Sequence, residues 1–242
     1  EVKPESPLYW SARLRIAGSL EAMERDDEAI DLLRVLTTED PSRPDPLVSL
    51  GDLLRSNKRF AESVKAYDRA IELLGDIDKR HWTILYSRGI SLERSRQWER
   101  AEKDFQRALE LNPEQPYVLN YLGYSWVDQG LNLDRARKMI ERAVELRPND
   151  GYIVDSLGWV LYRLNEFQGA VEKLERAVEL RPEDPTINDH LGDAYWRVGR
   201  HNEARFQWKR ALALEPEPDQ VSAIEGKILR GLGDTAPREK DS

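Results

Sequence analysis

The sequence offers few side chains that could perform catalysis or hold a metal ion. It contains no cysteine and three histidines, His81, His190 and His201. No two histidines have the spacing that places a pair of ligands on one helix face. Asp189 and Asp193 are four residues apart beside His190, so this group could be a cation site or an ordinary polar surface. We favour the polar surface, because clusters of this size give many false matches.

Sequence motifs of common enzyme sites are also absent. The patterns G-x-S-x-G, G-x-G-x-x-G and the phosphate-binding loop do not occur. Carboxylates are abundant, but no neighbouring residue indicates a buried partner that would separate the pKa values of two of them. The sequence therefore predicts a protein that is not an enzyme and that binds no cofactor and no metal.

Small residues recur at a fixed place along the chain. A glycine or alanine returns every 34 to 38 residues, at Ala17, Gly51, Gly89, Gly123, Gly158 and Gly192. A second small residue follows each of them, at Ala29, Ser63, Ala101, Ala136, Ala170 and Ala204. A constant period near 34 residues is typical of repeat architectures.

Residues 151–184 show how one period folds. The spacing of Val154, Leu157 and Leu161 places them on one helix stripe, and Ala170, Leu174 and Ala177 form a similar stripe in a second helix. A polar turn at 165–166 separates the two helices. Pro182 ends the second helix, and Asp184 before Pro185 is a typical start of the next one. Each period therefore predicts a helix–turn–helix hairpin that buries its apolar face only against its neighbours.

This pattern of small, large apolar and proline positions resembles the tetratricopeptide repeat over nearly the whole chain. The resemblance implies an all-α, right-handed superhelical solenoid with about thirteen helices and no strand. The predicted parts are an N-terminal linker (1–9), six repeats (10–43, 44–77, 82–115, 116–150, 151–184 and 185–218), a capping helix (219–233) and a flexible tail (234–242). The pattern is interrupted by an insertion at 78–81, by one extra residue within 130–133, and by Arg13 and Arg88 at positions that are normally apolar.

Charge and the two chain ends restrict the partners further. The net charge is −8 and basic residues alternate with acidic ones, so we expect no binding to nucleic acid. No apolar run approaches the ~18 residues of a membrane-spanning helix. The first residues resemble neither a start nor a signal peptide, and we expect the chain to be part of a longer or processed protein. Leu14, Ile16 and Leu20 then predict an open N-terminal edge that frays or self-associates.

The concave groove of such a solenoid is the expected binding surface. Helix periodicity places positions 2, 5, 9 and 12 of each first helix on one face, and in the tetratricopeptide repeat that face lines the groove. Aromatic residues crowd it in repeats 4 to 6, beside groups that can form hydrogen bonds. The predicted peptide-binding groove is Tyr117, Asn120, Tyr124, Tyr152, Asp155, Trp159, Tyr162, Arg163, Asp189, Asp193, Trp196 and Arg197. Trp159 and Trp196 are the expected anchors, whereas Tyr124 and Tyr162 fit either the groove or the packing between helices.

Two finer resemblances bear on function. The lysine and asparagine clamp with which chaperone partners hold a carboxyl terminus is missing here. The stretches 119–124, 155–163 and 190–196 resemble the C-terminal repeats of proteobacterial lipoproteins of the tetratricopeptide-repeat type. Some of those proteins are adaptors for a periplasmic carboxyl-terminal processing protease. This resemblance implies a periplasmic adaptor that is anchored to the outer membrane through a missing N-terminal region. The alternatives are a cytoplasmic location and a targeting or regulatory arm of a larger enzyme such as a glycosyltransferase.

Overall fold

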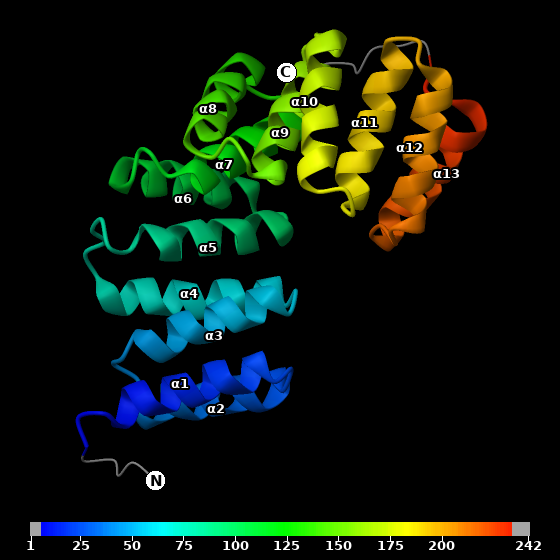
Figure 1. Cartoon of the computed structure of the whole chain (residues 1–242). Helices are drawn as coiled ribbons and strands as arrows, with labels where there is room; N and C mark the ends of the chain where they lie inside the picture. The colour runs from blue at the N-terminus through cyan, green and yellow to red at the C-terminus, as the bar shows by residue number, and fades with distance from the viewer. Residues whose placement is uncertain (1–5, 234–242) are drawn as a thin grey trace. The chain divides into compact units, whose positions relative to one another are not determined.

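The computed structural model describes residues 6–233, and every regular element in that range is an α-helix (Figure 1). Thirteen helices lie there: α1 (Tyr9–Ala22), α2 (Asp26–Glu39), α3 (Asp45–Ser56), α4 (Phe60–Leu74), α5 (Trp82–Arg94), α6 (Trp98–Leu111), α7 (Pro116–Gln129), α8 (Leu133–Leu146), α9 (Gly151–Arg163), α10 (Phe167–Leu180), α11 (Pro185–Arg197), α12 (His201–Ala213) and α13 (Pro218–Arg230). The predicted all-α repeat fold and the number of helices are confirmed for the described residues. The tail predicted at 234–242 lies outside them.

The chain divides into two compact units, residues 1–113 and residues 114–242. Unit 1 contains α1–α6 and unit 2 contains α7–α13. Within each unit consecutive helices pair as hairpins, for example α3 with α4 and α9 with α10, and each hairpin packs on the next (Figure 1). The six hairpins lie within the ranges predicted for the six repeats, except that α1 begins one residue earlier, at Tyr9, and α13 follows them as a single helix.

The recurring glycines explain why the two helices of a hairpin come close. A Cβ atom on Gly158 would lie 2.5 Å from Leu174 Cγ, and one on Gly192 would lie 2.4 Å from Trp208 Nε1. The large side chain of each second helix therefore sits directly on the backbone of the first. Leu174, Trp208 and the second small residues Ala170 and Ala204 are all completely buried. Any larger residue at the glycine would overpack this contact.

A buried ion pair accounts for the arginine that interrupts the apolar pattern of unit 1. Arg88 on α5 donates from Nε and Nη2 to the two carboxylate oxygens of Asp104 on α6, both at 2.7 Å. Its Nη1 donates to Asp68 on α4 at 2.9 Å. The Asp104 side chain is only 8% exposed. Arg88 therefore fills an apolar position by pairing its charge across three successive helices, an arrangement that needs all its partners in place.

The N-terminal edge of unit 1 has a mixed character. Ile16 is 52% exposed, whereas Leu14 and Leu20 pack partly against the core of the first two hairpins. The other irregular arginine, Arg13, donates to Glu39 at 2.8 Å and thereby joins α1 to α2. Fraying or self-association at this edge remains a prediction. No helix among residues 6–233 is long and apolar enough to cross a membrane.

Candidate functional site

The predicted groove residues all lie in unit 2, on the first helices of its three hairpins, α7, α9 and α11. Tyr117 and Tyr152 are exposed. Seven others are half-buried: Asn120, Tyr124, Trp159, Arg163, Asp189, Trp196 and Arg197. The remaining three, Asp155, Tyr162 and Asp193, are 6%, 3% and 5% exposed. The prediction that Asp155 and Asp193 line an open groove is therefore corrected, because each is buried among partners from neighbouring helices.

A stack of three rings forms the centre of this surface. The Trp159 indole lies between the Tyr162 ring, at 4.8 Å between centroids, and the His190 ring, at 4.1 Å. Both contacts are close to parallel, with interplanar angles of 6° and 12°. Tyr162 and Trp159 belong to α9, and His190 comes from α11, so the stack joins two hairpins. Trp159 is half-buried, while Tyr162 is buried in the packing between helices, the second of its two predicted roles.

His190 also explains why Asp155 is buried. Its Nδ1 lies 3.0 Å from Asp155 Oδ1 and 3.1 Å from Oδ2, and both side chains are 8% exposed. Burial by itself lowers the pKa of His190, but the charges of Asp155, Asp189 and Asp193 and the hydrogen bond to Asp155 raise it, and the net direction is upward. The imidazolium is therefore the form that this site stabilises.

The acidic pair considered as a cation site is occupied by the chain itself. Lys227 on α13 places Nζ 2.7 Å from Asp189 Oδ2 and 2.9 Å from Asp193 Oδ2. Asp193 also accepts from Trp208 Nε1 at 2.9 Å. Burial raises the pKa of Asp193 to about 6, although Lys227 acts in the opposite direction. Within residues 6–233 no group of three or more His, Cys, Asp or Glu side chains is arranged to hold a metal ion.

These titrating groups predict how the stability of unit 2 depends on pH. His190 has a folded pKa above its ordinary 6.5, so its contribution is complete below pH 6.5 and is lost as the pH rises through the folded value. Asp193, raised from 3.8 to about 6, acts in the same direction, and its contribution is lost as the pH rises through about 6. Amide hydrogen exchange of α9 and α11 should therefore accelerate as the pH rises above 6.5 and His190 loses its proton, after correction for the intrinsic rate. His190→Gln should show a weaker pH dependence; an equal dependence would contradict the assignment.

The C-terminal end of the surface is covered by the segment that follows α13. Trp196 Nε1 donates to the carbonyl oxygen of Leu232 at 3.1 Å. Arg197 Nη1 donates to the carbonyl oxygen of Gly233 at 2.8 Å, and its Nε lies 3.3 Å from the Tyr162 hydroxyl. The predicted anchor Trp196 is therefore in contact with the protein's own main chain.

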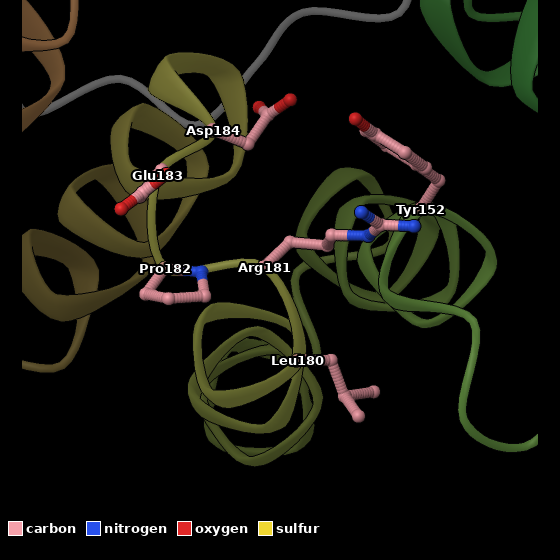
Figure 2. A pocket seen from close by; sticks show the side chains of 6 residues that line it. All are labelled: Tyr152, Leu180, Arg181, Pro182, Glu183 and Asp184. Carbon is pink, nitrogen blue, oxygen red and sulfur yellow. The ribbon is translucent and has the colours of Figure 1, made fainter.

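The exposed tyrosines lie at an edge of unit 2, where each is covered by an arginine. The Arg147 guanidinium lies 5.6 Å from the centroid of the Tyr117 ring, and that of Arg181 lies 5.1 Å from the Tyr152 ring. Figure 2 shows Arg181 reaching toward Tyr152. Tyr152 and residues 180–184 line an open depression of about 250 Å³. These contacts are cation–π pairs at the start of a first helix.

Three polar atoms on this surface have no hydrogen-bond partner among residues 6–233: Asp189 Oδ1 on α11 and two others. Asn120 Oδ1 on α7 and Trp159 Nε1 on α9 are buried, and no protein atom among residues 6–233 forms a hydrogen bond with either. Arg163, at the end of α9, donates to the carbonyl oxygen of Asp128 at 3.3 Å. An unsatisfied buried acceptor or donor costs roughly 1–3 kcal/mol in the folded chain.

Two residues of this surface were missed from the sequence. His190 was considered as a cation ligand or as part of a polar surface, and its partner, Asp155, is 35 residues away. Lys227 was not considered at all. Its signal was available, because numbering α13 as a seventh repeat places Lys227 at position 9, on the same face as Asp193 in the repeat before.

Comparisons with known proteins define the class. Family models described as tetratricopeptide repeat match residues 11–42, 44–73, 82–115 and 186–218, and one described as TPR repeat matches 158–199. The chain is therefore built from tetratricopeptide repeats. No curated protein matches it in sequence.

Solved structures of the same fold are similar at low sequence identity. One is a tetratricopeptide repeat protein from Parabacteroides merdae, with 16% identity, a TM-score of 0.72, and 90% of this chain and 85% of that chain covered. The Cut9–Hcn1 hetero-tetramer of APC/C gives 17% identity, a TM-score of 0.77, and coverage of 91% and 42%. YrrB, described as having an unusual peptide-binding site, gives 21% identity, a TM-score of 0.55, and coverage of 80% and 97%. These likenesses establish the fold alone.

Proposed function

We propose that this protein is a non-catalytic interaction scaffold, and that the groove surface of unit 2 binds an extended polypeptide segment. The observation that carries the proposal is the pair of unpartnered atoms, Asn120 Oδ1 and Trp159 Nε1, on adjacent first helices. Both atoms are buried, so side-chain rotation must bring them to the surface before the N–H donors and C=O acceptors of a polypeptide main chain can satisfy them. The half-buried Trp159 ring adds an apolar surface of the kind that anchors interfaces.

The test is selection from a random-peptide library on the purified chain, followed by affinity measurements on the selected peptides. Trp159→Ala is expected to weaken binding by about thirtyfold or more, as for a central aromatic anchor. Asn120→Leu removes the acceptor without emptying its space and should weaken binding less. The matched control is Phe206→Ala, because Phe206 on α12 is an aromatic residue of the same unit that is 62% exposed. If the selected peptides bind Trp159→Ala and Phe206→Ala with equal affinity, the groove surface of unit 2 is not where they bind.

The narrower proposal is that the scaffold is an adaptor for a carboxyl-terminal processing protease and is periplasmic, anchored to the outer membrane. Its support is the sequence of residues 119–124, 155–163 and 190–196, which resembles adaptors of that kind. Binding of the chain to purified host protease in an interferometry assay would support it. Absence of binding at micromolar protease concentration would contradict the adaptor role. The general scaffold function and the alternative, an arm of a larger enzyme, would then remain.

A further inference from the structure

The residues after α13 form a short segment whose main chain is held by side chains of α11. Trp196 Nε1 and Arg197 Nη1 donate to two consecutive carbonyl groups, those of Leu232 and Gly233. Both hydrogen bonds are made to main-chain atoms, which every polypeptide has. The donors come from neighbouring residues at the end of one helix and satisfy neighbouring acceptors, which is the pattern expected for binding an irregular or extended segment.

Gly231 fits this contact because it has no side chain. It has a φ of +72°, a conformation that other residues rarely adopt. A Cβ atom there would lie 2.0 Å from Trp196 Cζ2 and 2.1 Å from Cη2. The backbone of Gly231 therefore lies against the six-membered ring of the indole, and this place in the segment requires glycine.

The Trp196 ring is also held by three side chains of α12, so it cannot move aside easily. The His201 ring lies 4.1 Å from it and the Trp208 ring 5.5 Å, measured between centroids. The Arg205 guanidinium lies 4.9 Å from its centroid. A ring held by three neighbours is a preorganised surface, which lowers the entropic cost of binding a segment.

We propose that Trp196 and Arg197 form a main-chain-binding site for a glycine-containing extended segment, and that residues 231–233 occupy this site in cis. A segment from a partner must then displace them, so the chain's own C-terminal segment regulates access to this end of the surface. The regulatory part rests on the proposed function. The apparent affinity for a partner falls in proportion to the fraction of molecules in which the site is open.

The experiment uses the chain's own sequence as the probe. A synthetic peptide of residues 227–233 carries a fluorophore at its N-terminus, and its anisotropy is titrated with three proteins. The wild-type chain of 242 residues should bind it weakly, because the site is occupied. Gly231→Val, whose side chain collides with Trp196, and a chain that ends at Arg230 should both bind it at least tenfold more tightly. The shortened chain introduces no strained residue, so it tests the site even where the valine variant folds poorly.

Matched controls separate this site from other effects. Gly233→Ala should behave as wild type, because a Cβ atom there meets no atom within 4 Å. A probe with valine in place of the first glycine should not bind to the shortened chain. Adding Arg197→Ala to the shortened chain should weaken binding of the unmodified probe. Acrylamide quenching of tryptophan fluorescence should increase in both opened variants.

Two results would overturn the inference. Equal affinity of the probe for wild type and both opened variants would show that residues 231–233 do not cover the site. No binding to any of the three would show that Trp196 and Arg197 do not bind a main chain in trans. Neither result depends on how the library-selected peptides bind at Trp159. Failure of this inference and failure of the proposed function are therefore distinguishable.

Discussion

Replacing Arg88 with methionine is expected to lower the free energy of unfolding of unit 1 by about 3–5 kcal/mol. The substitution keeps much of the side-chain volume but removes both hydrogen bonds to Asp104 and the one to Asp68. Asp104 is then left as a carboxylate that is 8% exposed and has lost its counter-charge. Removing one partner of a buried pair costs more than the pair contributes, because the remaining charge is neither paired nor hydrated.

Urea unfolding combined with amide hydrogen exchange of α5 and α6 measures this effect, and the helices of unit 2 provide an internal reference. Arg107→Met is the matched control, because Arg107 is also an arginine of unit 1 but is 51% exposed and pairs with Glu110 on the surface. We expect it to change stability by less than about 0.5 kcal/mol. The double variant Arg88→Met with Asp104→Leu should recover much of the loss. A single variant within about 1 kcal/mol of wild type would show that the pair is not energetically important.

Replacing Gly158 with leucine is expected to destabilise unit 2 by about 1–3 kcal/mol or more. The first atom of the new side chain would lie 2.5 Å from Leu174 Cγ and 3.3 Å from the backbone nitrogen of Leu174. Leu174 is completely buried, so it has no free space into which it can move. The helices α9 and α10 must therefore separate, which also loosens the Trp159 stack that α9 carries.

Gly169→Ala is the control for this substitution, since it adds a side chain to the partner helix of the same hairpin. A Cβ atom at Gly169 would lie 3.5 Å from Leu161 Cδ1, an ordinary van der Waals distance. Alanine also favours a helix over glycine by up to about 1 kcal/mol, so we expect this variant to be slightly stabilised. Thermal unfolding followed by circular dichroism compares the two. Wild-type stability of Gly158→Leu would mean that the repeat is out of register with the sequence pattern.

The fold could be predicted because the signal for it is local and repeated. Gly158 and Leu174 are 16 residues apart, and the same small-to-large contact recurs between Gly192 and Trp208. Each repeat predicts the same hairpin independently, so the period can be recognised even where one repeat is irregular. The start of α11 was also predictable, and the Asp184 side chain accepts from the backbone N–H of Ile187 at 3.0 Å as expected for its first turn.

The candidate surface was harder to predict because its partners belong to different repeats. Helix periodicity gives the face on which Asp155 and Asp193 lie, but whether a face is open depends on what the next hairpin presents. His190 and Lys227 supply those partners, and they turn two apparent groove carboxylates into buried ones. To predict whether a side chain of a repeat protein is exposed, the residue at the matching position of the neighbouring repeat must therefore be considered as well.

These charge contacts make the repeats of unit 2 non-interchangeable. In an array of identical repeats any copy can follow any other, because every interface is the same. Here Asp155 requires a histidine in the following first helix, and the pair Asp189 and Asp193 requires a lysine in the one after that. Exchanging the hairpins α9–α10 and α11–α12 would leave buried carboxylates opposite the wrong side chains, at a cost of several kcal/mol. The charged side chains of the first helices thus determine the order of the hairpins, and α13 supplies the last partner, Lys227.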